Sequence, residues 1–133
     1  MNQTINAMAG KQRVLVVDDS RAMQAIIRRV LQSDALKHAE VETVASGEEA
    51  LEALERSTPQ LIVSDWHMPG MSGIELLQTV RQLGHSELAM GFVTTETSPA
   101  LLEQARTNGA SFFFFNASAN TDIYTLALHD AQP

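Results

Sequence analysis

The sequence predicts an α/β fold: a doubly wound sheet of five parallel strands with helices on both faces. Short apolar runs rich in β-branched residues alternate along the chain with amphipathic helical patterns. Two of these runs, at 14–17 and 61–63, are each followed closely by aspartate. A length of 133 residues suits one hydrophobic core, so we expect a single compact domain without an attached output domain.

The first two strands and the helix between them follow from residue spacing. Residues 14–17 form a continuous apolar run, which is typical of a strand buried on both faces. Ser20 can cap the next helix, whose apolar residues recur at helical spacing: Met23, Ile26, Ile27, Val30 and Leu31. Val41 and Val44 mark a second, more exposed strand.

The middle of the chain repeats this alternation. Ser46 and Glu49 predict a capping box at the start of a second helix, which Leu51 and Leu54 continue. Residues 61–63 then form a third strand, buried like the first. The helix after it carries its apolar residues at helical spacing and ends near Gly84; these residues are Ile74, Leu77 and Val80.

The last third of the chain predicts two more strands and two helices. Residues 88–93 form a fourth strand, and Ser98 as cap with Pro99 at the first helical position opens a helix. That helix contains Leu101, Leu102 and Ala105 and ends at Asn108-Gly109. Residues 112–115 form a fifth strand. A last helix is expected around Ile123, Leu126 and Ala127.

Polar side chains follow three of the predicted strands. Asp18 and Asp19 come after the first strand, Asp65 after the third and Thr94 after the fourth. The carboxyl ends of parallel strands meet at one edge of the sheet, so we expect these side chains to gather there. Three carboxylates repel one another unless they bind a cation or take up protons, and oxygen-only ligands favour Mg²⁺ or Mn²⁺. The alternative is that the paired aspartates only cap the following helix.

Four groups of residues together resemble the response-regulator receiver domain, the phospho-accepting module of two-component signalling. They are Val14-Leu15-Val16-Val17-Asp18-Asp19-Ser20, Asp65 with Met68-Pro69 and Gly73, Val93-Thr94, and Gly109-Ala110. The resemblance implies a flavodoxin-like (CheY-like) sheet with strand order 2-1-3-4-5. It also implies a receiver domain over residues 13–133 and an N-terminal extension over residues 1–12.

The same resemblance implies roles for the residues at the sheet edge. Asp65 would accept the phosphoryl group and would bind the metal ion together with Asp18, Asp19 and the backbone carbonyl of His67. The hydroxyl of Thr94 would hydrogen-bond the phosphoryl group. Transfer from a phosphohistidine to a carboxylate requires positioning and charge neutralisation more than acid–base chemistry. The aspartyl phosphate would hydrolyse and reset the signal, so the chain is not expected to be an enzyme that turns over a substrate.

Three further positions carry hypotheses. Phe113 matches the side chain that would move when phosphorylation draws the Thr94 hydroxyl inward; the alternative is an ordinary buried aromatic. His67 and Glu96 lie two residues beyond Asp65 and Thr94, and either one tunes the rate of dephosphorylation or is a solvated surface residue. The histidines are too scattered in the chain for a zinc site: His38, His67, His85 and His129.

The carboxyl-terminal part departs from the family pattern. Receiver domains carry a lysine after the fifth strand, and Asn116 holds that place here. Asparagine brings no charge, so the phosphorylated state would lose a charge-assisted contact of about 1.5–3 kcal/mol. The segment from Ser111 to Pro133 also resembles the translation of a sequencing-adapter read-through; the alternative is a divergent last strand and helix.

Our first interpretation is a single-domain receiver that takes phosphate from a sensor histidine kinase or phosphotransfer protein and signals by docking to another protein. The alternative is a non-switching pseudo-receiver that acts as an interaction module, which the missing lysine favours. Mg²⁺-dependent phosphohydrolases usually place two acids one residue apart after the first strand, whereas Asp18 and Asp19 are adjacent. A flavin or dinucleotide domain would need a glycine-rich phosphate loop, which the first strand lacks.

Charge and composition limit the partners. Nine basic and sixteen acidic residues give a net charge of −7, which opposes direct binding to nucleic acids or anionic membranes. The sequence contains no cysteine, so we expect no thiol chemistry, and a reducing compartment is compatible. No apolar run reaches the roughly 18 residues that a membrane helix needs, and we expect a cytoplasmic protein.

Overall fold

The computed structural model describes residues 12–33, 36–94, 98–116 and 123–126, and it describes only the backbone of residues 114–116 and 123–126. The strands are β1 (Arg13–Val17), β2 (Glu40–Val44), β3 (Leu61–Asp65), β4 (Ala89–Thr94), β5 (Phe112–Asn116) and β6 (Ile123–Leu126). The helices are α2 (Arg21–Leu31), α3 (Gly47–Arg56), α4 (Gly73–Gln82) and α5 (Pro99–Thr107). All five predicted strands and the first four predicted helices are confirmed.

The strands form one sheet with the order β2-β1-β3-β4-β5-β6. Every neighbouring pair from β2 to β5 is parallel, and β6 pairs antiparallel with β5. The predicted order 2-1-3-4-5 is therefore confirmed, with one antiparallel strand added at the edge. The pairing sets Val17 beside Ser64 and Asp65 beside Val93, so β1, β3 and β4 end at the same edge.

The helix predicted around Ile123 and Leu126 is wrong. The segment Ile123–Leu126 is strand β6, whose backbone pairs with β5 from Phe113 to Asn116. Isoleucine, tyrosine and threonine favour extended backbone, and the open edge of β5 offered hydrogen-bonding groups, so pairing outweighed a weak helical pattern. Ala127 lies outside the described residues.

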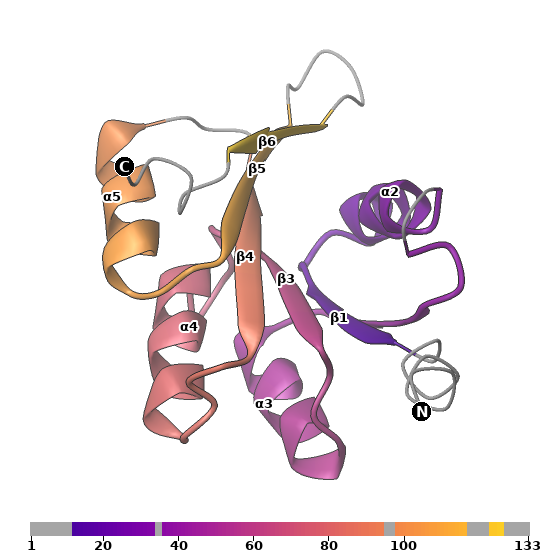
Figure 1. Cartoon of the computed structure of the whole chain (residues 1–133), viewed down its shortest axis with the longest axis horizontal. Helices are drawn as coiled ribbons and strands as arrows, with labels where there is room; N and C mark the ends of the chain where they lie inside the picture. The colour runs from indigo at the N-terminus through magenta and orange to yellow at the C-terminus, as the bar shows by residue number, and fades with distance from the viewer. Residues whose placement is uncertain (1–11, 34–35, 95–97, 117–122, 127–133) are drawn as a thin grey trace, which may run out of the picture.

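Helices cover both faces of the sheet, as predicted. Figure 1 shows α2 on one side of the strands and α3, α4 and α5 on the other. The core on the α2 side packs Ile27 against Val14, Val16, Val63 and Val93. The larger core on the other side combines strand residues with apolar residues of the three helices, among them Leu54, Leu76, Leu77, Val80 and Ala105.

One close contact within the sheet explains an irregularity of the fourth strand. Gly91 lies beside Phe112 in the pairing of β4 with β5. A Cβ atom at position 91 would overlap the ring of Phe112, so glycine leaves the space that this ring fills. The glycine is therefore compatible with a strand here because a neighbouring aromatic covers it.

Serine side chains start three of the helices. Ser20 and Ser46 accept hydrogen bonds from the backbone N–H groups of Met23 and Glu49. The carboxylate of Glu49 accepts from Ala45 rather than from the backbone of Ser46, so the capping box predicted there is incomplete. A full capping box instead starts α4, between Ser72 and Glu75. Ser98 precedes Pro99 as predicted, but its side chain makes no capping bond.

The four described helices contain 9 to 11 residues each. None of them, within the described part of the chain, is long and apolar enough to cross a membrane.

Candidate functional site

Asp18, Asp19 and Asp65 come together at the carboxyl ends of β1 and β3. One carboxylate oxygen of each residue lies within 4.8 Å of the corresponding oxygens of the other two. Asp18 is buried, Asp65 is half-buried and Asp19 is exposed, so the cluster opens to solvent on one side. This spacing is suited to three oxygen ligands that share one small cation.

Backbone N–H groups orient two of the carboxylates. Ser20 N–H donates to Asp18 Oδ1 at 2.9 Å, in the same turn in which the Ser20 hydroxyl caps α2. Trp66 N–H donates to Asp65 Oδ1 at 2.8 Å. Each of these carboxylates thus has one oxygen held by the backbone. Ser20 and Trp66 follow Asp18 and Asp65 by two residues and by one, so each N–H group lies beside the carboxylate that it holds.

Burial and mutual repulsion disfavour the charged forms of the cluster. Burial raises the pKa of Asp18 to about 7, the negative charges of Asp65 and Asp19 add to the shift, and the Ser20 N–H opposes it. Burial also raises the pKa of Asp65, with the Trp66 N–H opposing and the charge of Asp19 adding. Without a cation, these groups hold protons more tightly than ordinary aspartates do. The donor set and its uncompensated charge therefore fit a hard divalent ion.

A close approach between β3 and α4 explains Gly73. The N–H of Gly73 donates to Trp66 O at 2.9 Å, and a Cβ atom at position 73 would overlap the carbonyl oxygen of Asp65. The Phe92 ring lies on the same side, 2.9 Å from the position of that Cβ. Only glycine therefore lets α4 begin directly against the end of β3, where Asp65 lies.

Thr94 and His67 lie near the cluster in different environments. Thr94 is the last residue of β4 and only 4% exposed, and the pairing of Asp65 with Val93 puts it one residue further along the neighbouring strand. His67 is exposed, two residues after Asp65. Glu96 lies outside the described residues, and Asn116 ends β5, where only its backbone is described.

Behind the acidic cluster, three aromatic rings pack together. The rings of Trp66 and Phe92 meet edge to face with centroids 4.8 Å apart, and Phe113 lies 6.0 Å from Trp66 and 6.3 Å from Phe92. Phe113 is fully buried. The sequence pattern singles out Phe113 but does not reveal that it packs with Trp66 and Phe92. Ser64 pairs with Phe92, and Phe92 pairs with Phe113, so these three residues lie on one face of the sheet. Only the register of the strands reveals that the two phenylalanines are neighbours.

The family model of the response regulator receiver domain matches residues 14–127. The chain belongs to this family. The match begins at the first residue of the buried β1 run and includes residues 111–127 of the carboxyl-terminal segment that departs from the pattern. The resemblance deduced from the sequence is thus confirmed. The boundaries at 1–12 and 13–133, and the origin of residues 111–133, stay predictions.

Relatives of this receiver domain come from plants and bacteria. The two-component response regulator ORR3 of Oryza sativa subsp. indica is 33% identical, over 85% of this chain and 86% of its own length. The two-component response regulator ARR17 of Arabidopsis thaliana is 28% identical, over 94% of this chain and 88% of its own length. Among solved structures, the chemotaxis protein CheY4 of Vibrio cholerae has a TM-score of 0.71 at 33% identity, covering 83% of this chain and 89% of that one.

Proposed function

We propose that this receiver domain accepts a phosphoryl group on Asp65 from a sensor histidine kinase or a phosphotransfer protein and signals by docking to another protein. The observation that carries the proposal is the convergence of three carboxylates, with oxygens within 4.8 Å of one another, at the end of β3. A carboxylate cluster of this kind can hold a divalent cation beside the accepting aspartate, and that cation would offset the negative charge that the incoming phosphoryl group adds.

Mg²⁺, or Mn²⁺, fits the proposed site. Asp18, Asp19 and Asp65 would hold it through carboxylate oxygens, and the backbone carbonyl of His67 is a further proposed ligand. When bound, a divalent ion would offset the charge of the carboxylates and of the phosphoryl oxygens. The raised pKa values of Asp18 and Asp65 support this proposal, since burial and then the neighbouring negative charge disfavour the ionised carboxylates, and a bound cation would favour them.

The proposed transfer is a single displacement at phosphorus. A carboxylate oxygen of Asp65 attacks the phosphorus of a phosphohistidine, the new O–P bond forms, and the P–N bond breaks with its electron pair going to the imidazole nitrogen. The Trp66 N–H holds Asp65 Oδ1 and so restrains the carboxylate. Thr94, at the end of the adjacent strand, would donate a hydrogen bond to a phosphoryl oxygen.

Hydrolysis of the aspartyl phosphate would reset the protein. Water attacks the phosphorus, the bond to the Asp65 oxygen breaks, and inorganic phosphate leaves. His67 is exposed two residues after Asp65 and is a candidate for tuning this rate, as is Glu96. We expect His67→Ala to change the rate at which the aspartyl phosphate decays, measured by loss of the phosphorylated species in intact-protein mass spectrometry. Unchanged decay would exclude His67 from this role.

The experiment that tests the function uses Trp66, the only tryptophan in the chain and a direct neighbour of Asp65. Its fluorescence should respond to Mg²⁺ and then again to phosphoramidate, a small-molecule phosphodonor, and mass spectrometry should find one phosphoryl adduct. Asp65→Asn should lose the adduct and the second response. If the wild-type protein gains no adduct with Mg²⁺ and phosphoramidate, phosphoryl acceptance on Asp65 is wrong.

One observation favours a second candidate function, a pseudo-receiver that binds a partner without switching. Asn116 stands where the family has a lysine, and the only described lysine, Lys37, lies between α2 and β2. A response of Trp66 to Mg²⁺ without an adduct would favour this candidate.

A further inference from the structure

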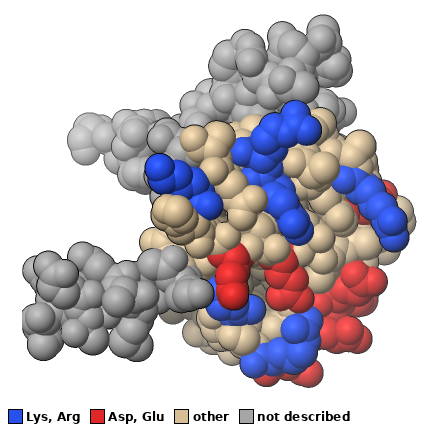
Figure 2. All heavy atoms as spheres, turned by 90° about the vertical axis from the view of Figure 1, so that its right-hand side faces the viewer, with Lys and Arg blue, Asp and Glu red and all other residues tan. Residues whose placement is uncertain are grey.

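A groove of about 840 Å³ lies between α2 and the outer edge of β2. Arg21, Arg28 and Arg29 line its helical wall, and Thr43 and Ala45 line its strand side. Glu49 is the one acidic residue of the lining, and its carboxylate accepts from the N–H of Ala45. Figure 2 looks at the face of the molecule that carries α2. The upper half of this face carries mainly basic side chains, whereas acidic and basic side chains mix in the lower half.

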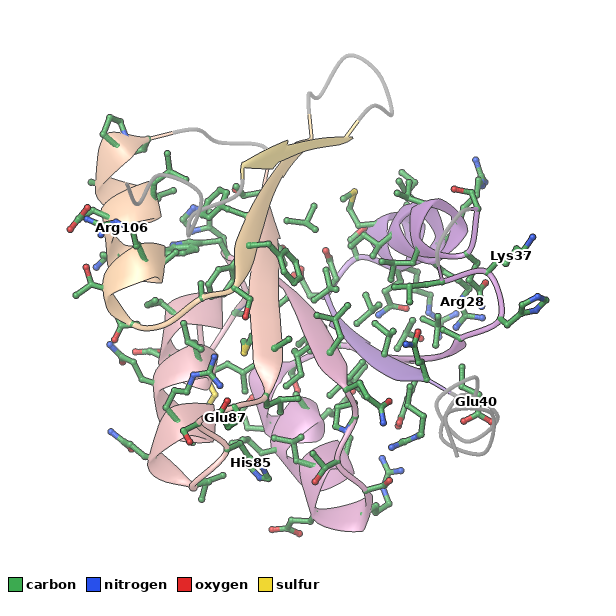
Figure 3. All side chains as sticks on the ribbon, viewed as in Figure 1. Arg28, Lys37, Glu40, His85, Glu87 and Arg106 are labelled. Atoms are coloured by element: carbon green, nitrogen blue, oxygen red, sulfur yellow. The ribbon has the colours of Figure 1, made fainter. Side chains whose placement is uncertain are left out.

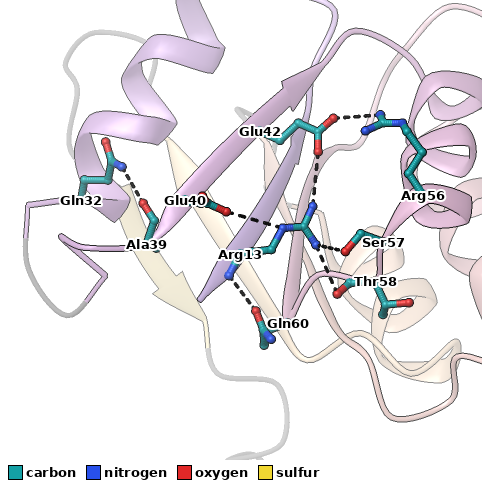
Figure 4. A network of polar contacts seen from close by, with 9 residues as sticks. All are labelled: Arg13, Gln32, Ala39, Glu40, Glu42, Arg56, Ser57, Thr58 and Gln60. Carbon is teal, nitrogen blue, oxygen red and sulfur yellow. Dashed lines mark hydrogen bonds and ion pairs between the residues drawn. The ribbon is translucent and has the colours of Figure 1, made fainter. Parts of the chain in front are cut away.

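The arginines of this groove differ from the others in the chain. Three other arginines contact glutamates: Arg13 and Arg56 share Glu42, as Figure 4 shows, and Arg106 contacts Glu103 at 2.7 Å. Arg81 donates to three backbone carbonyls. In contrast, the groove arginines contact no carboxylate of the described chain. Within the described chain, three arginines without a carboxylate partner therefore lie along one groove of a protein whose net charge is −7.

Stabilisation of the helix does not explain all three arginines. Arg28 and Arg29 lie in the last turn of α2, where positive charge interacts favourably with the helix dipole. Arg21 is the first residue of the same helix, where positive charge is unfavourable. Figure 3 shows Arg28 between α2 and the sheet, and among the described residues its guanidinium donates a hydrogen bond to the carbonyl of Val41 alone, at 3.4 Å.

The outer edge of β2 offers backbone groups for pairing. Glu40 N–H donates to Gln12 O, and Val44 O accepts from Asp18 N–H, so these residues face the β1 side. Backbone groups alternate along a parallel strand, so Val41 and Thr43 direct their N–H and C=O groups away from β1. Strand β2 is the last strand of the sheet on this side, in the part of the chain that the structure describes.

Side chains cover the two ends of this edge and leave its middle open. Gln32 donates to the carbonyl of Ala39 at 3.0 Å, and Glu49 accepts from the N–H of Ala45 at 2.8 Å. Between them, no described residue hydrogen-bonds the N–H of Val41 or either outward backbone group of Thr43. A strand edge left open in this way can bind an extended segment by backbone pairing.

We propose that the groove binds an extended, acidic segment of a partner protein, which pairs with the open edge of β2. Its carboxylates lie at alternate positions, on the face directed toward Arg21, Arg28 and Arg29. A second copy of this chain is a poorer occupant, because pairing through β2 would bring two arginine-lined grooves together. The proposal does not depend on phosphoryl transfer at Asp65.

The test uses a fluorescently labelled heptapeptide in which glutamate alternates with valine and threonine, added to the full chain. We expect saturable binding, measured by fluorescence anisotropy, that weakens at least about tenfold in the double variant Arg28→Glu/Arg29→Glu. Arg106→Glu, which changes an arginine of α5 on the opposite side of the molecule in Figure 3, is the matched control and should bind normally. The same heptapeptide with lysine in place of glutamate should not bind.

Pairing with β2 is tested separately from charge. Thr43→Pro removes an outward N–H without removing a bond to β1, and it should weaken binding, whereas Thr43→Val should not. In the unaltered protein, hydrogen exchange provides a readout that needs no variant. The amides of Val41 and Thr43 should exchange fast and become protected when the heptapeptide binds, while the amide of Glu42 should be protected throughout.

Several outcomes would overturn the proposal. They are absence of binding, equal binding of the lysine peptide, or binding without protection of Val41 and Thr43. Dimerisation through β2 in sedimentation analysis would also overturn it. In each case the Mg²⁺ response of Trp66 is measured in the same samples. Loss of peptide binding with that response intact separates failure of this proposal from failure of the proposed function.

Discussion

The fold raises the pKa of the Asp18 carboxyl group, and this makes metal binding depend on pH. Its pKa is raised to about 7 by burial and by two neighbouring aspartates. A metal ligand must be deprotonated, so below that pKa binding has to displace a proton. We expect the affinity for Mg²⁺ to be about tenfold weaker at pH 6 than at pH 8. Calorimetry in buffers of different ionisation enthalpy should detect released protons at pH 6, and equal affinities at the two pH values would contradict the prediction.

Gly73 is the residue whose substitution should disturb the site most without changing a charge. A Cβ atom there would overlap the carbonyl oxygen of Asp65, which belongs to the backbone and cannot move aside cheaply. We expect Gly73→Ala to lower the free energy of unfolding by roughly 3 kcal/mol and to weaken Mg²⁺ binding. Chemical denaturation measures the first effect.

The matched control for Gly73 is Gly84→Ala. Position 84 has φ +102, but no atom of the described chain lies within 4 Å of the new Cβ, so only the backbone conformation is penalised, by about 1–2 kcal/mol. The control should leave Mg²⁺ binding unchanged. Equal effects of the two substitutions on the site would show that Gly73 acts only through backbone freedom.

The acidic cluster could be anticipated from the sequence because it follows from topology alone. Aspartates after β1 and β3 must share an edge once the strands are parallel and adjacent. The contacts of Phe113 with Trp66 and Phe92 could not be anticipated from the sequence, because they depend on which residues pair across β3, β4 and β5. The overlap that requires Gly73 likewise depends on how closely α4 approaches the sheet.

At the scale of elements, hydrogen bonds from the Arg81 side chain connect the end of α4 to two neighbouring segments. Its guanidinium donates to the carbonyls of His85, Leu88 and Gly109 at 2.6, 2.7 and 2.8 Å. Removal of the guanidinium would leave these acceptors without their donor. We expect Arg81→Met to lower the free energy of unfolding by about 3 kcal/mol, and Arg81→Lys to lower it less.

Arg106→Met is the control for Arg81. It removes a solvent-exposed ion pair with Glu103 and should leave the free energy of unfolding almost unchanged. Urea denaturation measures both variants. If Arg81→Met lowers the free energy of unfolding as little as the control does, the three carbonyls find other partners and the hydrogen bonds of Arg81 are not important for stability.

Element boundaries were predictable where a local signal fixes them. Ser20 and Ser46 cap helices because a serine side chain needs only the next turn of the same helix. Strand β6 was mistaken for a helix because its pairing with β5 is a tertiary contact that spacing does not reveal. The hydrogen bond from Arg81 to the carbonyl of Gly109 joins α4 to a residue far along the chain. It is also a tertiary contact, which residue spacing does not reveal.

For the whole molecule, the acidic cluster implies that stability and function oppose each other. The pKa of Asp18 rises from an ordinary value of 3.8 to about 7 in the folded chain, so folding favours its protonated form. This contribution is fully present below pH 4 and is lost as the pH rises through 7. We expect the metal-free protein to lose roughly 2–4 kcal/mol of its free energy of unfolding between pH 4 and pH 8.

Asp18→Asn isolates this effect, because asparagine keeps the shape of the side chain and removes the charge. Without metal, we expect the variant to be more stable than the wild type at pH 8 and to depend less on pH. Saturating Mg²⁺ should reverse the order, since it stabilises only a protein that binds it tightly. Glu55→Gln, which changes an exposed carboxylate on α3, should keep the wild-type pH profile. Thermal unfolding at the two pH values with and without Mg²⁺ measures all three proteins, and an Asp18→Asn variant less stable than the wild type without metal would show that the carboxylate stabilises the fold.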